Sequence, residues 1–458
     1  MTATGASSGV PWLAVRAGVR GSTSARVDVL AASARRVVLV QIDPERRRGA
    51  LTATDSATLA DGARLARAQR LPLVVLLDTS GADIGGGMAS LHGWGQAARA
   101  LTRCSGIVPV IFVVVGLTVS GPALLLGMAD VVVMTPEAVA YVSGPASVAA
   151  LTGMRIEPEH LGGQSVHARM TGVAALLATN RAEALDIVAD VLDHLPDHVD
   201  QLPPRRSSDD PGDRPTPELR DLLPAHPSGS YDIRHVVKAV ADHGEFLELR
   251  SQWAPQLATG LIRLDGHPVG VVANQPQSMA GTLDIAASQK GARFVSFCDT
   301  FNLPLLTVVD TPGFMPGRDL EWRGMIRHGA QLVFAYAEAT VPRVCLVVRK
   351  AFGGAYIVMD SKLMGNDLCL AWPSAQIAVM GARGAVQILH RREDASTQAR
   401  LIDEYQERFL NPYVAAERGY VDQIIDPSET RSVVSRAFAM LADKVEHLPA
   451  RKHANGPL

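Results

Sequence analysis

Cysteine is scarce in this chain, and the motifs of the commonest metal and nucleotide sites are missing. The four cysteines stand at positions 104, 298, 345 and 369, with no CxxC pair and no cluster of cysteine and histidine. This spacing excludes a zinc site of the usual kind and a disulfide framework, and it fits a reducing compartment. The chain also lacks an HExxH segment, a P-loop and a GxGxxG turn that opens a βαβ unit. The sequence therefore predicts no metal site and no nucleotide-binding loop.

Neither sign of charge is in excess. The 44 Lys and Arg residues are balanced by 46 Asp and Glu residues, which gives a formal net charge of -2. Proteins that bind nucleic acid or an anionic membrane usually carry a basic excess. We therefore expect neither nucleic acid nor a membrane among the partners.

What the chain does contain is a long internal repeat. Residues 71–81 read LPLVVLLDTSG, and residues 303–313 read LPLLTVVDTPG. The similarity continues where Asp130–Pro136 returns as Asp367–Pro373. The spacing between the copies is far too long for a solenoid, whose units span roughly 20–50 residues. The sequence therefore predicts a duplicated domain.

The duplication and the local composition predict four segments. The first 27 residues contain no acid, as in a transit peptide, but Pro11, Gly18 and Gly21 would interrupt an amphipathic helix. We therefore predict a poorly ordered tail at 1–35. A stretch at 203–224 is rich in Pro, Asp and Arg, which is typical of a linker. The two predicted domains are 36–202 and 225–458.

Within each half, β-branched strands alternate with helical segments, which indicates an α/β layer structure. The expected strands are 36–42, 73–77, 110–115, 261–263, 269–274, 305–309 and 344–348. The expected helices are 56–68, 88–103, 284–301, 324–339 and 354–361, with another that begins near Ser120.

The stretch 108–134 is apolar enough to resemble a membrane span, with Asp130 near its end. Its counterpart in the second half carries Arg349, Lys350, Asp360 and Lys362. Because the two copies share one architecture, we interpret the first as a buried strand, turn and helix, and we expect a soluble, cytoplasmic protein.

Two glycine turns are the strongest candidates for chemistry. Ser120-Gly121 and Gly353-Gly354 each follow an apolar strand and open a helix. Backbone N–H groups at such a helix start lack partners and can stabilise an oxyanion. One such turn is usually only a packing feature, but two at equivalent positions suggest a reaction that develops two oxyanions.

The strand ends and the histidines offer weaker candidates. Asp78 and Asp310 stand where the two copies of the repeated strand end. We interpret them as turn-forming residues rather than acid–base catalysts. The histidines are scattered, so surface or capping roles are expected for them.

Several segments of the second half resemble one family closely. They are VANQP at 272–276, LDIAASQK at 283–290, DTPGFMPG at 310–317, RKAFGGAY at 349–356 and VMGA at 379–382. They resemble the carboxyltransferase β subunits of biotin-dependent acyl-CoA carboxylases of the acetyl-/propionyl-CoA carboxylase type. The first half fits more loosely, through Leu161-Gly162-Gly163, His167 and Ser143-Gly144-Pro145.

This resemblance implies two tandem crotonase-like domains and two substrates. One is an acyl-CoA, and the other is carboxybiotin on a separate biotin carboxylase/biotin carrier α subunit. The chain itself has neither a biotinylation segment nor an ATP-binding loop. The family's site lies between two subunits, which implies a homo-oligomer, a dimer at minimum with a hexamer as the larger alternative.

The resemblance also assigns roles to residues of this chain. Ser120 and Gly121 would stabilise the thioester enolate, and Gly353 and Gly354 the ureido oxygen of biotin. The biotin anion would remove the α-proton, so no side-chain base is needed. Ile357 would line the acyl pocket and favour a short acyl chain. The implied substrate-binding residues are Thr79, Ser80, Gly81, Ala82, Gly144, Ala355, Tyr356 and Ile357.

The departures from the family pattern lie in the first half. Asp83 stands where the family has a basic residue, and Ser120 stands where it has glycine. Two alternatives therefore stay open. The chain could be a biotin-dependent decarboxylase or transcarboxylase subunit, or a non-catalytic β-subunit paralogue within a mixed oligomer.

Overall fold

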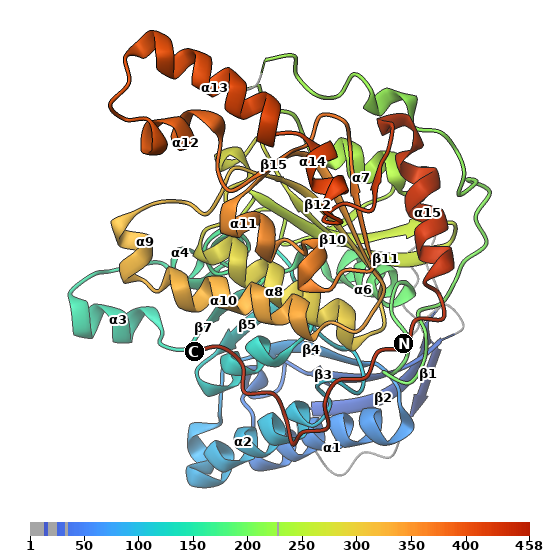
Figure 1. Ribbon diagram of the computed structural model, residues 1–458. Helices are drawn as coiled ribbons and strands as arrows, with labels where there is room; N and C mark the ends of the chain where they lie inside the picture. Colours follow the sequence, from blue (N-terminus) through green and yellow to red (C-terminus); the bar gives the residue numbers. More distant parts are fainter. Residues whose placement is uncertain (1–12, 17–24, 33–34, 227–228) are drawn as a thin grey trace. The chain divides into compact units, whose positions relative to one another are not determined.

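The computed structural model describes residues 13–16, 25–32, 35–226 and 229–458. These form two compact units, Met1–Pro204 and Arg205–Leu458 (Figure 1). Each unit contains one eight-stranded sheet with helices packed on it. The units are described separately below.

The first unit starts with an antiparallel ribbon and continues as parallel strands. Its strands are β1 (Leu13–Arg16), β2 (Ala25–Ala32), β3 (Arg35–Ile42), β4 (Leu73–Thr79), β5 (Val110–Val119), β6 (Val131–Met134), β7 (Val139–Tyr141) and β8 (Leu176–Leu177). Its α-helices are α1 (Ala53–Gln69), α2 (Met88–Thr102), α3 (Pro145–Thr152), α4 (Pro158–Gly162), α5 (Gln164–Val166) and α6 (Arg181–Asp193).

The first sheet has the order β1-β2-β3-β4-β5-β6-β8, and β7 pairs with β5. Pairing is antiparallel from β1 to β3 and parallel beyond. Strand β4 is almost continuously apolar because parallel strands are buried on both faces. Helices α1 and α2 run side by side, with α1 against β2 and β3 (Figure 1). Helix α1 begins at a capping box between Thr52 and Asp55.

The second unit repeats this plan. Its strands are β9 (Leu247–Leu249), β10 (Leu257–Leu264), β11 (His267–Asn274), β12 (Leu305–Thr311), β13 (Arg343–Phe352), β14 (Leu368–Ala371), β15 (Gln376–Ala378) and β16 (Gln423–Ile424). Its α-helices are α7 (Arg234–Val240), α8 (Ile285–Thr300), α9 (Arg318–Trp322), α10 (Met325–Glu338), α11 (Gly353–Val358), α12 (Ala382–Leu389), α13 (Ala395–Phe409), α14 (Pro412–Glu417) and α15 (Thr430–Met440).

The two sheets match strand for strand. The second has the order β9-β10-β11-β12-β13-β14-β16, and β15 pairs with β13 as β7 pairs with β5. Its first three strands are again antiparallel and the rest parallel. Helices α8 and α10 lie side by side, and α8 packs on β10 and β11 (Figure 1). The predicted domain duplication is confirmed.

Local details are duplicated as well. A left-handed turn at 47–49 in the first unit returns at 279–281 in the second, and each ends in glycine. A Cβ on Gly49 would lie 2.0 Å from the carbonyl oxygen of Asp78, and one on Gly281 would lie 2.5 Å from that of Asp310. Only glycine can therefore close either turn against the neighbouring strand end.

The expected strands and helices are found with small shifts at their ends. The segment after Ser120 forms a 3-10 helix, Gly121–Met128, where Pro122 stands in the first turn. The stretch 108–134 is thus β5, this 3-10 helix and β6. Nowhere in the described ranges is a helix both long and apolar enough to cross a membrane.

The first unit begins before residue 36. Strand β2 pairs with β3 along its whole length, from Ala25 opposite Ile42 to Ala32 opposite Arg35, and β1 adds to β2. The predicted tail therefore contains two strands of the sheet, β2 and the edge strand β1, because a strand next to β3 can satisfy its backbone groups there. The remaining tail residues, 1–12, 17–24 and 33–34, lie outside the described part.

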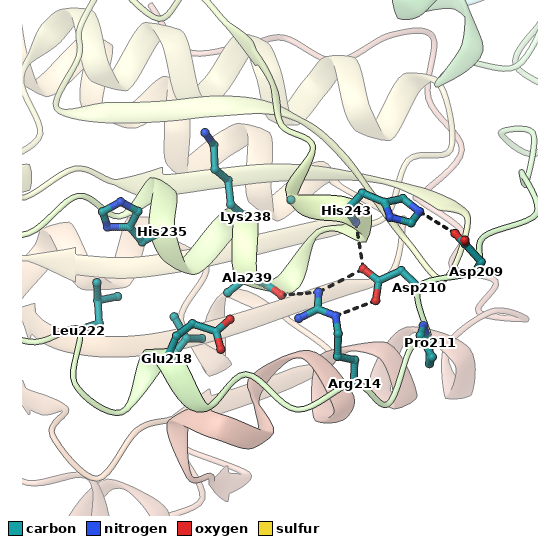
Figure 2. Close-up of a pocket in the computed structure, with 12 residues that line it drawn as sticks. Asp209, Asp210, Pro211, Arg214, Glu218, Leu222, His235, Lys238, Ala239 and His243 are labelled. Atoms are coloured by element: carbon teal, nitrogen blue, oxygen red, sulfur yellow. Dashed lines mark hydrogen bonds and ion pairs between the residues drawn. The ribbon is translucent and has the colours of Figure 1, made fainter.

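The segment predicted as a linker is fixed to the second unit. Asp210 accepts from Arg214 Nε at 2.6 Å and from the N–H of His243 at 2.9 Å, and Arg214 also reaches the carbonyl oxygen of Ala239 at 3.1 Å (Figure 2). These groups line a pocket of about 850 Å³. This ion pair, its hydrogen bonds to residues beyond the segment, and the packing of Leu219 in the core hold the segment, so 205–224 belongs to the second unit.

A buried lysine makes the stability of the second unit depend on pH. Lys290 is 1% exposed, and its Nζ donates to the carbonyl oxygens of Arg250 and Trp253 at 2.9 Å. Burial lowers the pKa of Lys290 to about 7. From there to the ordinary pKa near 10.5, the unfolded chain holds a proton that the folded chain has lost. The free energy of unfolding should therefore rise with pH in this window, by up to about 1.4 kcal/mol per pH unit.

The measurement is denaturant unfolding of the wild type and of Lys290→Met at pH 7 to 10.5. The quantity compared is the difference between their free energies of unfolding at each pH. Buried cysteines such as Cys298, whose thiol pKa is raised by burial, add the same pH dependence to the stability of both proteins, so it cancels in that difference. A difference that does not change with pH would contradict the assignment.

Candidate functional site

The glycine turn of the second unit lies where β13 runs directly into α11. Gly353 has φ +61°, and a Cβ there would lie 3.0 Å from the carbonyl oxygen of Val379. A Cβ on Gly354 would meet only the Phe314 ring, at 3.6 Å. The first N–H groups of a helix have no intrahelical acceptor, so this turn can present backbone donors.

A pocket of about 440 Å³ lies over this turn. Its lining is apolar apart from tyrosine hydroxyls, one arginine and the backbone of the turn: Gly353, Gly354, Tyr356, Ile357, Ile377, Ala378, Val379, Tyr405, Phe409, Val414, Ala415, Arg418 and Tyr420. Tyr405 and Phe409 lie one turn apart on α13 with ring centroids 4.9 Å apart. The pocket therefore suits a flat, mostly apolar group with few polar atoms.

The predicted substrate residues that follow the turn differ in how they can act. Ile357 is 47% exposed and lines this pocket beside Gly353 and Gly354, whereas the resemblance placed it in the acyl pocket. Tyr356 also lines it, although only 6% of its surface is exposed. Ala355 is fully buried and is absent from the lining, so its side chain cannot touch a ligand in this pocket.

Asp310 is the centre of a buried polar cluster behind this turn. Its carboxylate accepts from Tyr231 Oη at 2.9 Å, from Arg349 Nε at 3.0 Å and from the N–H of Lys350 at 3.1 Å. Burial raises the pKa of Asp310, and the neighbouring Arg349 opposes that rise. The carboxylate therefore fixes the end of β13 just before the glycine turn.

The interpretation of Asp310 and Asp78 as turn-forming residues is wrong. Asp78 likewise accepts across the sheet, from the N–H of Leu117 at 3.0 Å, and burial raises its pKa. The turns are formed instead by threonines: the N–H of Gly81 donates to Thr79 Oγ1 at 3.1 Å. The same bond recurs between residues 313 and 311 at 3.4 Å. Because the partners of each aspartate lie tens of residues away, the local sequence did not reveal this role.

The turn of the first unit differs from the prediction. Ser120 has φ 64° and ψ -151°, and its N–H donates to the carbonyl oxygen of Tyr141 at 3.0 Å. Residue 122 is proline and has no N–H. The expectation that both N–H groups of Ser120-Gly121 are free is therefore wrong, because the β5–β7 pairing uses one of them. The Gly121 N–H and the exposed Ser120 hydroxyl remain at the turn.

Ser120 is in a backbone region that almost only glycine occupies, at a cost of about 1–3 kcal/mol. We expect Ser120→Gly to raise the free energy of unfolding of the first unit by about 1 kcal/mol, because part of the gain is lost to the flexibility of glycine in the unfolded chain. Denaturant unfolding checks this value. A loss of stability would show that the serine side chain makes a stabilising contact.

The other predicted residues of the first unit gather around Ser120. Gly81, in the 79–82 turn after β4, has φ +99°, and a Cβ there would lie 3.2 Å from Ser120 Cβ. Gly144 precedes α3, and its Cβ position is 3.2 Å from the ring of Tyr141, whose carbonyl holds Ser120. The structure therefore brings the predicted acyl-CoA residues of this unit together.

Asp83 has a partner that the sequence did not suggest. Its carboxylate pairs with Arg47 at 3.1 Å and accepts from the N–H of Gly85 at 3.3 Å. Arg47 belongs to the left-handed turn 47–49, so it restores a positive charge beside the substituted acid. Within the residues that the structure describes, no group of three or more His, Cys, Asp or Glu could hold a metal ion.

Two α/β units of one topology, each with a glycine turn where a central parallel strand opens a helix, define a tandem crotonase-like carboxyltransferase. The chain belongs to the carboxyl transferase family, whose domain model, "Carboxyl transferase domain", matches residues 31–456.

Individual relatives agree with this membership. The chain is 46% identical over 407 residues to the propionyl-CoA carboxylase beta chain of Saccharopolyspora erythraea, covering 84% of this chain and 74% of the relative. It is 39% identical over 417 residues to the methylmalonyl-CoA carboxyltransferase 12S subunit of Propionibacterium freudenreichii subsp. shermanii, covering 89% and 79%.

A solved structure of the transcarboxylase 12S hexamer, with methylmalonyl-CoA and methylmalonic acid bound, matches with a TM-score of 0.93 and 38% identity. It covers 95% of this chain and 85% of that one. These comparisons confirm the predicted fold class and enzyme class. The chain is a carboxyltransferase subunit of the biotin-dependent acyl-CoA carboxylase type.

Proposed function

We propose that this chain moves carboxylate from carboxybiotin to the α-carbon of a short acyl-CoA, acetyl-CoA or propionyl-CoA. The observation that supports the proposal is the duplicated glycine turn, which offers backbone donors for an oxyanion in each unit. Relatives at 42–46% identity are named for propionyl-CoA or acetyl-/propionyl-CoA carboxylation, which supports the choice of acyl group. A separate biotin carboxylase/biotin carrier subunit would deliver the biotin.

The second unit is assigned to biotin. Its 440 Å³ pocket has aromatic walls at Tyr405 and Phe409 and suits the fused rings of biotin in size and polarity. Carboxybiotin supplies the carboxyl group and, after losing it, the base for the α-proton. The N–H groups at Gly353 and Gly354 would stabilise the negative charge that develops on the ureido oxygen.

The first unit is assigned to the acyl-CoA. The Gly121 N–H and the Ser120 hydroxyl would donate to the thioester oxygen as it becomes an enolate. The turn 79–82 and Gly144 would shape the pocket around the thioester. The Ser120 hydroxyl would thus replace the Ser120 N–H, which is already hydrogen-bonded to Tyr141 of β7. A serine can therefore act at the position where the family has glycine.

The assembly is proposed to be a homo-oligomer, a dimer at least and a hexamer by analogy with the solved transcarboxylase 12S hexamer. The proposed location is the cytoplasm. Expression with a biotin carboxylase/biotin carrier subunit, ATP and labelled bicarbonate tests the whole reaction. Label in an acid-stable product with acetyl-CoA or propionyl-CoA is expected, and label that stays on biotin would refute the assigned transfer.

The likeness to the 12S subunit of methylmalonyl-CoA carboxyltransferase favours one second candidate, a transcarboxylase subunit. Such a subunit would exchange carboxylate between biotin and two acyl compounds without ATP. The partner that co-purifies discriminates the two: a biotin carboxylase supports the first proposal, and a biotinylated carrier without a biotin carboxylase supports the transcarboxylase. A second, complete β subunit would instead support a third reading, a non-catalytic paralogue.

A further inference from the structure

The biotin pocket of the second unit contains a single formal charge. Of the thirteen residues that line it, twelve are glycine, aliphatic or aromatic, and the remaining one is Arg418. An apolar wall lowers the local dielectric, so one guanidinium there dominates the selection of charge in a ligand. The pocket should therefore prefer an apolar group that carries one negative charge.

The backbone of Arg418 is held firmly. Helix α14 is capped by Asn411, whose Oδ1 accepts the N–H groups of Tyr413 and Val414 at 3.1 Å. Immediately after Arg418 the chain reverses at Gly419, with φ +74°, and the Tyr420 N–H bonds to the carbonyl oxygen of Ala415 at 2.9 Å. The guanidinium is therefore presented from a fixed point at the pocket.

The side chain of Arg418, in contrast, is exposed and makes no hydrogen bond or ion pair with the described part of the chain. Other arginines of this unit are buried against carboxylates: Arg343 on Asp360, Arg349 on Asp310 and Arg431 on Asp242. Arg418 has no such structural partner, so its five donors are available to a ligand.

We propose that Arg418 binds the transferable carboxylate of carboxybiotin and makes the pocket select the carboxylated form over free biotin. This inference rests on the assignment of the second unit to biotin. The planar guanidinium matches a carboxylate with two parallel hydrogen bonds. The rings of Tyr405, Phe409 and Tyr420 would then contact the fused rings of the same molecule.

The chemistry predicts which kinetic constant changes. The carboxylate is present in the bound donor but leaves during transfer, so the contact with Arg418 does not strengthen in the transition state. Removing a contact that is weakened on the way to the transition state weakens donor binding and does not slow the chemical step. Free biotin, the acceptor of the reverse reaction, lacks the carboxylate, so its binding should not depend on Arg418.

The test compares Arg418→Gln and Arg418→Lys with the wild type in the complete complex. The control is Arg400→Gln, an exposed arginine on α13 that pairs with Glu404 away from the pocket lining. With carboxylated carrier as the varied donor, Arg418→Gln should raise KM at least tenfold without lowering kcat. The KM of Arg418→Lys should lie between those of the wild type and Arg418→Gln, because lysine keeps the charge but cannot form the two parallel hydrogen bonds.

In the reverse direction, with a carboxyacyl-CoA as donor and biotinylated carrier as acceptor, KM for the carrier should not change. Equal increases of both KM values would show that Arg418 contacts the carrier or the biotin ring and would overturn the inference. Unchanged KM values for the carboxylated carrier would overturn it as well. If the wild type itself transfers no carboxylate, it is the proposed function that fails, before Arg418 is tested.

Discussion

Replacement of Gly354 by valine is expected to abolish carboxyl transfer while the protein stays folded. A Cβ at this position meets only the Phe314 ring at an ordinary contact distance of 3.6 Å, so the fold has room for the substitution. The branched side chain would instead fill the space in front of the turn, where the ureido oxygen is to be stabilised. Loss of one oxyanion contact costs about 100-fold to 1,000-fold in kcat.

The matched control is Gly384→Val on α12 of the same unit. A Cβ there also finds open space, with Met380 Sδ at 3.7 Å, but the residue does not line the biotin pocket. Steady-state kinetics and thermal unfolding of both variants separate lost chemistry from lost stability. If Gly354→Val turned over at the wild-type rate, the oxyanion role of this turn would be refuted.

Replacement of Arg431 by methionine is expected to destabilise the second unit by about 3–5 kcal/mol. Arg431 is fully buried, and its guanidinium donates to Asp242 at 2.7 Å and to the carbonyl oxygens of Pro211 and Asp210 at 3.0 Å. Methionine would leave Asp242 buried, still bonded to two backbone N–H groups but without its ion pair. Segment 205–224 would also lose the two hydrogen bonds that Arg431 donates to the carbonyl oxygens of Asp210 and Pro211.

Arg436→Met, on the exposed face of α15, is the control, because an exposed arginine contributes little. Denaturant unfolding gives the two differences in free energy. Proteolysis adds a second observation, since Arg431→Met should expose the 205–224 segment to cleavage. A loss below about 1 kcal/mol, with no new cleavage, would mean that the segment is held by its other contacts.

The plan of the fold could be predicted because the sequence states it twice. Strands β4 and β12 have the same apolar pattern and end in the same Asp-Thr, and the structure gives both the same cross-sheet bond. The turns were predictable for the same reason. Their glycines, such as Gly81 and Gly353, mark backbone positions of positive φ, which other residues avoid.

What could not be predicted depends on contacts between distant residues. The use of the Ser120 N–H follows from pairing Val119 with Tyr141, and no local pattern shows that register. The 205–224 segment reads as a linker because most of its residues are polar and only Leu219, Leu222 and Leu223 reach the core, while its partner Arg431 lies more than 200 residues further along the chain. A polar segment whose partners lie far along the chain does not show an apolar period.

The account is tested most directly by running the transfer backwards with this protein alone. Carboxyl-labelled malonyl-CoA and methylmalonyl-CoA are offered with biotin, or with a biotinylated carrier, and without ATP. The account predicts label on biotin with at least one of the two thioesters, and the better one identifies the acyl group. A folded, oligomeric protein that leaves both thioesters intact would contradict the claim that this chain contains two working oxyanion turns.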